Sequence, residues 1–248
     1  MVITLNRPEA RNAVNAAVAR GIGSALEEAD QDPEVRAVVI TGAGDKAFCA
    51  GADLKAVARG EDIMPPETKE WGFAAYVNHH IGKPTIAAVR GFALGGGTEI
   101  ALASDLVVAA EDASFGLPEV KRGIIAAAGG AFRLAAQLPT KIGTELLLTG
   151  DTLDAPTAKS YGLVNRVVPA DRVLAEAIAL AERIGANAPL AVQASKRIAR
   201  GISAGQVETE RGAWEINEQE LLGLMNSADA QEGPRAFAEK RAPVWQAR

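Results

Sequence analysis

Three short segments hold the residues of this chain that could carry chemistry. They are Phe48–Lys55, Gly95–Glu99 and Phe115–Glu119. Glu99 and Glu119 are carboxylic acids that could act as a general acid and a general base. The glycines beside them have no side chains, so backbone N–H groups there would be open to a ligand oxygen. Two acids beside such donors would suit acid/base chemistry on an activated carbonyl compound, although spacing alone does not show that the acids converge.

Each of these features also has an ordinary structural explanation. The triplet Gly95–Gly97 is equally typical of a tight strand-to-helix turn, and it lacks the residues of a Walker loop or a G-x-G-x-x-G fingerprint. Glu99 falls in the first turn of the helix expected there, where an acid suits the helix dipole. Glu119 follows Pro118 and could be a surface acid at a turn. The sequence pattern leaves both readings open.

The remaining reactive side chains favour neither nucleophilic nor metal chemistry. Cys49 is the single cysteine and lies between Phe48 and Ala50, a context that predicts a buried, inert thiol rather than a nucleophile. His79 and His80 are adjacent and are the only histidines. Because no Cys or second His stands at ligand spacing, we expect no metal site and no Ser-His-Asp triad.

Short strands alternate with helices over the first two-thirds of the chain, which is typical of an α/β layered fold. Hydrophobic patterning predicts strands over 1–5, 35–41, 84–89, 106–110 and 163–168. It predicts helices over 12–30, 68–81, 95–103, 140–148, 155–161, 171–186, 190–200 and 207–224, and a surface loop over 61–66. In the tail, Ser227 is expected to cap one helix and Pro234 to begin another. We expect a core over residues 1–190 and a helical region over 191–248.

Composition excludes several classes of protein. The chain has 248 residues, 48% of them hydrophobic, with 26 Lys and Arg against 31 Asp and Glu, so it has enough apolar material for a core and is not a disordered chain. A net charge of −5 argues against a general nucleic-acid binder. Charged residues interrupt each long apolar run, no export signal opens the chain, and one cysteine allows no internal disulfide. We therefore expect a cytoplasmic protein with no membrane partner.

Several ordered motifs identify a family. They are Ile3–Asn15, Ala47–Lys55, Lys83–Glu99, Phe115–Glu119, Leu148–Asp151 with Gly162–Asn165, and Glu232–Arg241. Together they resemble the enoyl-CoA hydratase/isomerase (crotonase) superfamily nearly end to end. The resemblance implies a spiral of ββα units over 1–190 with a CoA thioester site. It also implies a helical region over 191–248 that forms homotrimers, often as a dimer of trimers. The hydratases of this family act in fatty-acid metabolism and β-oxidation.

The resemblance also assigns roles to the candidate residues. The backbone N–H groups of Ala52 and Gly96 match the oxyanion hole, and Glu99 and Glu119 match the catalytic pair. In the family mechanism both acids hold one water at the C2=C3 bond of an enoyl thioester. The acid that matches Glu119 supplies the proton to C2, and the acid that matches Glu99 helps activate the water that attacks C3. We expect one of the two acids to be protonated at rest, since nearby like charges raise one pKa.

Coenzyme A is part of the substrate, so no separate cofactor is expected. The family resemblance implies substrate contacts from Ala52, Asp53, Leu54, Lys55, Gly96, Phe237 and Lys240. Lys55 matches a lysine near the nucleotide phosphates, although it could equally be a solvated lysine at a helix start. Phe237 and Lys240 match residues that reach the CoA of a neighbouring subunit.

The chain departs from the family pattern in two places. Its first residues correspond to a strand that is usually internal, so either the family's first strand is missing or the native start lies upstream of Met1. Ala126 stands where many hydratases have proline, in the stretch that lines the acyl pocket, which leaves the acyl group open. Other reactions of the superfamily are isomerisation, dehalogenation, decarboxylation and carnitinyl-CoA-type dehydration. A non-catalytic acyl-CoA-binding protein is a further alternative. Most isomerases lack the first glutamate, so Glu99 together with Glu119 favours hydration.

Overall fold

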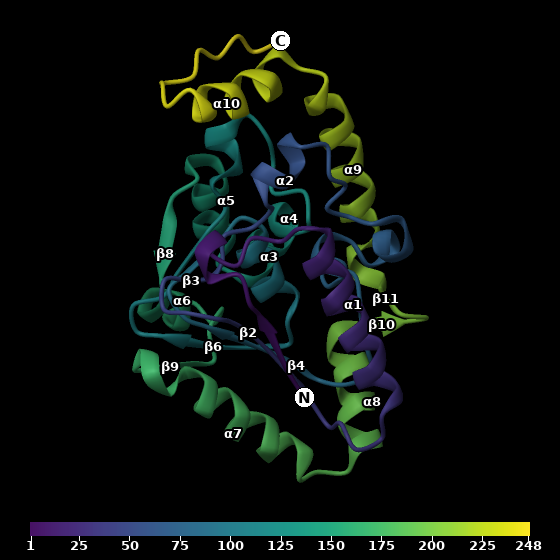
Figure 1. The fold of residues 1–248 in the computed structure, drawn as a ribbon. Helices are drawn as coiled ribbons and strands as arrows, with labels where there is room; N and C mark the ends of the chain where they lie inside the picture. Colours follow the sequence, from purple (N-terminus) through teal and green to yellow (C-terminus); the bar gives the residue numbers. More distant parts are fainter.

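The computed structural model describes residues 1–248 and contains two main sheets and ten α-helices (Figure 1). The first sheet is fully parallel, with the order β1-β2-β4-β6-β9. Its strands are β1 (Val2–Leu5), β2 (Val38–Gly42), β4 (Thr85–Val89), β6 (Leu106–Ala110) and β9 (Arg166–Val168). All five residues of β4 are buried, as expected for the centre of a parallel sheet that is covered on both faces.

The second sheet has the order β3-β5-β7-β8 and is made of three-residue strands. They are β3 (Ala47–Cys49), β5 (Phe92–Leu94), β7 (Ser114–Gly116) and β8 (Thr152–Asp154). The first three run parallel, and β8 pairs antiparallel to β7. Each of β3, β5 and β7 follows a strand of the first sheet after a short connection. The chain therefore passes from one sheet to the other three times, which confirms the α/β crotonase-like spiral of ββα units.

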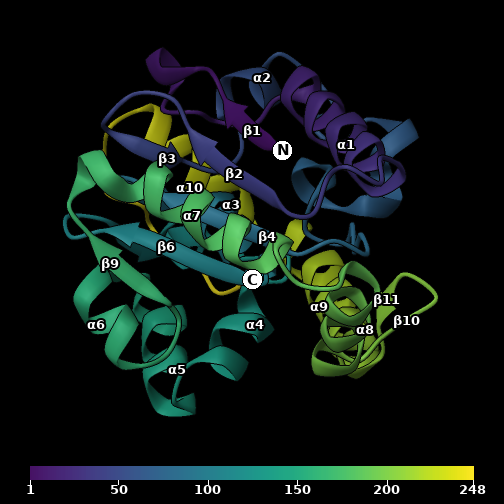
Figure 2. The same ribbon diagram turned by 90° about the horizontal axis from the view of Figure 1, so that it is seen from below.

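Helices cover the sheets and form the tail (Figures 1 and 2). In chain order they are α1 (Ala16–Gln31), α2 (Leu54–Ala58), α3 (Gly96–Ala103), α4 (Gly130–Gln137), α5 (Thr140–Thr149), α6 (Ala155–Ser160), α7 (Val173–Gly185), α8 (Pro189–Arg200), α9 (Arg211–Met225) and α10 (Ala228–Ala238). The hairpin β10 (Ile202–Ser203) and β11 (Gln206–Val207) lies between α8 and α9. All eight residues of α3 are buried, so this helix lies in the core.

Caps explain where two of the helices begin. The Asn15 side chain accepts a hydrogen bond from the Val18 N–H at the start of α1, and Ser227 accepts one from the Ala230 N–H at the start of α10. Both residues satisfy an N–H that the first helical turn leaves without a partner. The predicted cap at Ser227 is therefore confirmed.

Two local predictions are wrong. The expected helix over 68–81 is replaced by two 3-10 helices, η2 (Pro66–Trp71) and η3 (Phe73–Ala75). Gly72, Ala74 and Ala75 have positive φ angles there, which end each helical turn. Pro234 does not begin a second tail helix, since it lies inside α10.

The tail runs along one side of the molecule and over one end. In Figure 1, α8 and α9 follow one flank and α10 crosses the top of the molecule. Residue 190, the expected boundary, falls at the start of α8, and the division into a core and an oligomerisation region stays a prediction. None of the helices combines the length and the apolar character needed to cross a membrane.

Candidate active site

The first motif and the glycine triplet meet at the N-terminus of α3. A Cβ atom placed on Gly51 would lie 3.0 Å from the Gly96 nitrogen and 3.1 Å from the Leu94 oxygen. Gly51 has a φ of +88° and Gly95 a φ of +53°. Glycine is therefore needed at both turns because of the backbone conformation. At Gly51 it is also needed because the backbone segment of Leu94 and Gly96 lies so close.

The N–H groups of Ala52 and Gly96 donate a hydrogen bond to no atom of the protein. The neighbours of Ala52 are held by Val14, whose N–H donates to Gly51 O at 2.8 Å and whose O accepts from the Asp53 N–H at 2.9 Å. Gly96 is the first residue of α3, where helical N–H groups have no partner inside the helix. The structure thus brings two donors together without an acceptor, which is the arrangement that an oxyanion requires.

Neighbouring side chains and backbone leave no space for substituents on the triplet. A Cβ on Gly96 would lie 2.2 Å from the Phe73 ring, and one on Gly97 would lie 2.1 Å from the Cys49 oxygen. These distances are far below van der Waals contact. The glycines are therefore required by packing as well as by access to the N–H groups.

Glu99 is buried in the first turn of α3, with a relative exposure of 4%. Its Oε1 accepts a hydrogen bond of 2.9 Å from the Gly130 N–H at the start of α4. Burial, followed by the nearby negative charge of Glu119, raises the pKa of Glu99 to about 8. An acid that only served the helix dipole would be exposed to water, so this environment favours a functional role.

Glu119 lies in the 3-10 helix η4 (Pro118–Arg122) and points at the glycine triplet. A Cβ on Gly95 would lie 2.8 Å from Glu119 Oε1. Glu119 Oε2 is buried and has no hydrogen-bond partner, and burial raises the pKa of Glu119 to about 7. A buried carboxyl oxygen without a partner is a natural place for a bound water or a substrate atom. The two acids that lie twenty positions apart in the sequence therefore converge beside the free N–H groups.

Of the three residues after Ala52 that are expected to contact the substrate, one is buried and two are exposed. Asp53 is buried, caps α2 by accepting from the Lys55 and Ala56 N–H groups at 3.1 Å, and pairs with Arg7 at 2.9 Å. Burial alone would raise the pKa of Asp53, but these hydrogen bonds and Arg7 hold it below its usual range. Leu54 and Lys55 are exposed. Asp53 therefore shapes the turn, while Lys55 is accessible to a phosphate.

Of the two tail residues expected at the CoA site, Phe237 lies close to the Glu119 segment of its own chain. Helix α10 packs on η4, since a Cβ on Gly233 would lie 1.8 Å from the Arg122 oxygen. Phe237 is half-exposed, with the Arg122 guanidinium 4.1 Å from its ring centroid. Lys240 is exposed and makes no ion pair. The sequence did not single out Arg122, which adds a positive charge beside Phe237.

The thiol and the histidines lie outside this constellation. Cys49 is fully buried, as predicted, and burial raises the pKa of its thiol to about 12, which disfavours the reactive thiolate. His79 stacks on Trp71 at 4.0 Å and its Nε2 is 2.8 Å from Glu27 Oε1. Burial lowers the pKa of His80 to about 4.

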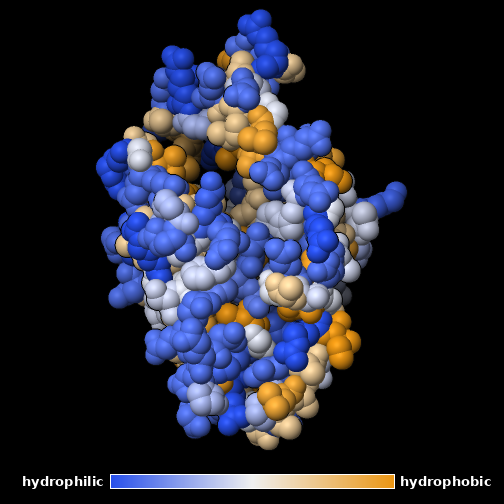
Figure 3. Space-filling model, turned by 90° about the vertical axis from the view of Figure 1, so that its right-hand side faces the viewer, coloured by the Kyte–Doolittle hydropathy of each residue, from blue (hydrophilic) through white to orange (hydrophobic).

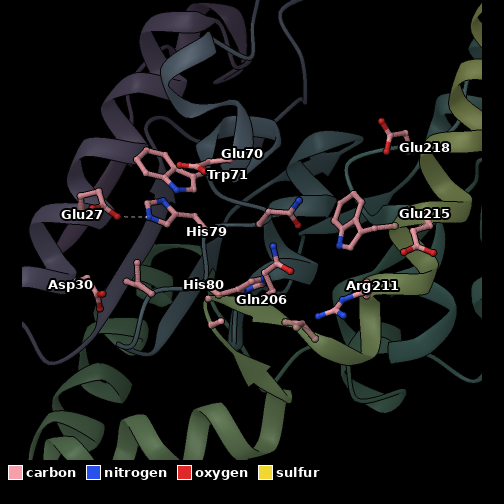
Figure 4. A pocket seen from close by; sticks show the side chains of 16 residues that line it. Glu27, Asp30, Glu70, Trp71, His79, His80, Gln206, Arg211, Glu215 and Glu218 are labelled. Carbon is pink, nitrogen blue, oxygen red and sulfur yellow. Dashed lines mark hydrogen bonds and ion pairs between the residues drawn. The ribbon is translucent and has the colours of Figure 1, made fainter.

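Both histidines line a separate polar cavity of about 540 Å³ (Figure 4), and neither Glu99 nor Glu119 is among its lining residues. Figure 4 shows Glu27, Trp71 and His79 on one side of this cavity and Arg211 and Glu215 of α9 on the other. We place the candidate active site at the glutamates, because their raised pKa values and the free donors lie there. No group of three or more His, Cys, Asp or Glu side chains could hold a metal ion, and a reaction without a metal stays a prediction.

Sequence reasoning missed the residues that hold the turn beside Glu99. They are Gly130 at the start of α4, Arg133 in the same helix, and Glu210 and Asn217 from the tail. The Gly129-Gly130 pair was a visible signal of a helix start. The pairing of Arg133 with Glu210 links positions 77 apart, and no local pattern could indicate it.

Comparisons with known proteins identify the family of this chain. The family model of enoyl-CoA hydratase/isomerase matches residues 1–248. A carnitinyl-CoA dehydratase of Salmonella typhi is 45% identical over 250 residues, which cover 99% of this chain and 94% of the relative. The crystal structure of a carnitinyl-CoA hydratase from Mycobacterium avium is 63% identical with a TM-score of 0.98, and the match covers 100% of this chain and 95% of the other. The crystal structure of an enoyl-CoA hydratase from Mycobacterium tuberculosis H37Rv is 47% identical with a TM-score of 0.76, at the same coverage.

Proposed function

The chain belongs to the enoyl-CoA hydratase/isomerase (crotonase) superfamily as a hydro-lyase, and we propose that it adds water reversibly across the C2=C3 bond of a 2-enoyl-CoA thioester. The observation that supports this reaction best is the convergence of Glu99 and Glu119 beside two N–H groups without acceptors. A protein that only bound acyl-CoA would not need two buried acids at that place.

The Ala52 and Gly96 N–H groups would bind the thioester oxygen. Conjugation makes C3 electrophilic when the carbonyl oxygen takes on enolate character, and donors that are already in place stabilise that charge without reorganisation. Removal of one such donor typically lowers a rate on the order of 100- to 1,000-fold. The positive end of α3 lies at the same point and favours the same charge.

The two glutamates would hold the water between them. As the oxygen of the water bonds to C3, Glu99 accepts a proton from that water. Glu119 gives its own proton to C2. The product then carries OH on C3 and H on C2, and one proton remains on Glu99. Its return to Glu119 resets the pair. General acid and base assistance of this kind contributes roughly 100- to 10,000-fold.

The pKa values bear on where the proton rests. Burial raises the pKa of both acids, to about 8 for Glu99 and about 7 for Glu119, so the substrate-free pair can hold a single proton near neutral pH. The Gly130 N–H bond favours the ionised form of Glu99. Hydration needs Glu99 ionised and Glu119 protonated. A water shared by the two acids can carry the proton between them.

The nucleotide end of CoA would be met by local positive charge. The whole chain carries −5, so a polyanion must be attracted by individual side chains. Lys55 and Lys240 are exposed, and Arg122 lies beside Phe237. We assign Lys55 and Lys240 to the phosphates and Phe237 to the apolar part of CoA.

A second candidate is the dehydration of a carnitinyl-CoA-type thioester. It is favoured by the names of relatives that are 45% and 63% identical, and it is the same chemistry in the reverse direction on a different acyl group. Ala126 is buried beside Gly130, where it leaves more room than proline would. The acyl group therefore distinguishes the two candidates, whereas the catalytic residues do not.

The test is the loss of conjugated absorbance of enoyl-CoA substrates on addition of the protein. Crotonyl-CoA, longer enoyl-CoA thioesters and an enoyl-CoA with a terminal trimethylammonium group should be compared. Glu99→Gln and Glu119→Gln should each lower the rate at least 100-fold, while Glu145→Gln, at an exposed position of α5, should leave it unchanged. Undiminished hydration by either active-site variant would reject the mechanism. No turnover of any substrate, together with tight CoA binding, would favour a binding protein.

We also propose that the tail assembles the chain into a homotrimer or a dimer of trimers. Apolar side chains on α8 and α9 are exposed, and they are Leu190, Ile198, Ile216, Leu222 and Met225. Apolar patches interrupt the charged surface on the side of the molecule shown in Figure 3. Burial of such side chains between subunits would stabilise an oligomer.

A further inference from the structure

The most deeply buried cation of the protein has no part in the mechanism above. Arg133 in α4 is only 1% exposed. Its Nε donates to Glu210 Oε1 at 3.0 Å and its Nη2 donates to Glu210 Oε2 at 2.7 Å, so the pair has the strong two-point geometry of arginine with a carboxylate. Its Nη1 is buried and has no partner. A cation buried at this cost calls for a role.

Arg133 and Glu99 lie against adjacent residues of the same turn. A Cβ on Gly129 would lie 3.1 Å from Arg133 Nη1, and a Cβ on Gly130 would lie 2.9 Å from Glu99 Oε1. The Gly130 N–H donates to Glu99, and the Arg133 N–H donates to Gly129 O at 3.0 Å. The unpartnered edge of the guanidinium therefore lies directly behind the turn that holds the carboxyl group.

Further hydrogen bonds tie this turn to the rest of the molecule. Glu210 belongs to the 3-10 helix η6 (Glu208–Glu210), just before α9. Asn217 in α9 donates to Ala127 O at 2.9 Å, and Gln137 at the end of α4 donates to Leu102 O in α3 at 2.9 Å. The turn at the start of α4, which contacts Glu99, is thus held by α3 on one side and by the tail on the other.

We propose that Arg133 is a positioning residue for Glu99: the Arg133–Glu210 pair fixes the N-terminus of α4 against the carboxyl group and places a positive charge behind it. This inference rests on the proposed function only for its effect on turnover. Its effect on the ionisation of Glu99 can be measured without substrate.

The charges around Glu99 set the expected signs. Glu119 in η4 and Arg133 in α4 are the charged groups that act on Glu99, and they act in opposite directions. Arg133 lowers the pKa of Glu99, and Glu210 offsets part of that positive charge. Removal of Arg133 should therefore make Glu99 harder to ionise, whereas removal of the Glu210 charge should make it easier. If the pair served only as a mechanical anchor, removing Arg133 and removing the Glu210 charge would shift the pKa of Glu99 in the same direction.

The experiment is a carboxyl ¹³C NMR titration of the substrate-free protein, with Glu99→Gln used to assign the Glu99 signal. Arg133→Met should move the Glu99 titration to higher pH, and Glu210→Gln should move it to lower pH by a smaller amount. Arg133→Lys keeps the positive charge, so Glu99 should titrate at nearly the same pH as in the native protein. Arg166→Met, which breaks the remote Arg166–Glu176 pair, should leave it in place.

Turnover gives the second measurement. The kcat of Arg133→Met should fall with little change in KM, because Glu99 must give up its proton before hydration. Shifts of the same sign in Arg133→Met and Glu210→Gln, or no shift in either, would overturn the proposal. Glu210→Gln keeps the buried guanidinium, so it tests the sign even if Arg133→Met does not fold. If no enoyl-CoA is turned over, the proposed function fails while the titration still decides the role of Arg133.

Discussion

In the proposed mechanism, the pair formed by Glu99 and Glu119 works only when it holds one proton. Both pKa values are raised, to about 8 and about 7, because both groups are buried and Glu119 repels the charge of Glu99. With both acids protonated the pair has no base, and with both ionised it has no acid. We expect a bell-shaped dependence of kcat/KM on pH with its maximum between about pH 7 and pH 8, measured by loss of enoyl-CoA absorbance. A flat profile from pH 5 to pH 9 would contradict the assignment.

The same burial makes Glu99 a cost to stability above pH 4.5. Its pKa rises from 4.5 to about 8 on folding, so the unfolded chain ionises first and stability falls as pH increases through this range. Glu99→Gln should leave stability nearly unchanged at pH 4 and raise it at pH 8.5 by on the order of 1–4 kcal/mol. Urea unfolding at both pH values measures this, with the exposed Glu145→Gln as the control. An equal effect at both pH values would mean that charge is not the cause.

The glycines differ in whether the fold has room for a side chain. Gly96→Ala would push a methyl group into the Phe73 ring and move the N–H at the oxyanion site, so kcat should fall about 100-fold. Gly21 lies in α1 with nothing within 4 Å of an added Cβ. Gly21→Ala should keep full activity and stabilise the protein by about 0.5–1 kcal/mol. Rate measurements and thermal unfolding of both variants test the contrast, which fails if Gly96→Ala is as active as Gly21→Ala.

Sequence reasoning reached these residues unevenly. The motifs were sufficient to select Glu99, Glu119, Ala52 and Gly96 through the family resemblance, and the structure brings all four together. Arg133 could not be selected, because a buried arginine in a helix looks like any solvated arginine until its distant partner is known. The binding roles of Lys55, Phe237 and Lys240 stay predictions.

At the scale of elements, the long periodic segments were predictable and the short ones were not. Helix α1 and strands β4 and β6 lie where hydrophobic patterning predicts them. Strands β3, β5 and β7 have three residues each, too few for an alternating pattern to show, and their pairing across the spiral defines them. These strands lead to the N–H donors. Because they are so short, the second sheet could not have been derived from periodicity.

The contact between α10 and η4 gives a prediction at this scale. A Cβ on Gly233 would meet the Arg122 oxygen at 1.8 Å, so Gly233→Ala should lift α10 from the segment that carries Glu119. We expect KM for an enoyl-CoA to rise several-fold and α10 to become sensitive to protease. Gly223→Ala is the control, since an added Cβ in α9 has nothing within 4 Å. An unchanged KM in Gly233→Ala would show that α10 does not support the CoA site.

At the scale of the whole molecule, the tail is hydrogen-bonded to the candidate active site and also exposes apolar side chains. Its inner side holds the turn in front of Glu99 through Glu210 and Asn217. Its outer side presents Ile198 with a relative exposure of 82%. One region thus holds the turn beside Glu99 and offers the surface proposed for assembly.

The proposed assembly predicts that a charge at Ile198 will separate the subunits. Burial of an isoleucine side chain contributes about 1.5–3 kcal/mol, and an unpaired carboxylate in the same place is strongly unfavourable. Light scattering should give three or six chains of 25.7 kDa for the native protein and one chain for Ile198→Asp. Leu148→Asp, at a position of α5 that is 75% exposed, should keep the native mass. If CoA contacts cross between subunits, dissociated Ile198→Asp should also bind CoA more weakly, whereas an unchanged mass in that variant would place the interface elsewhere.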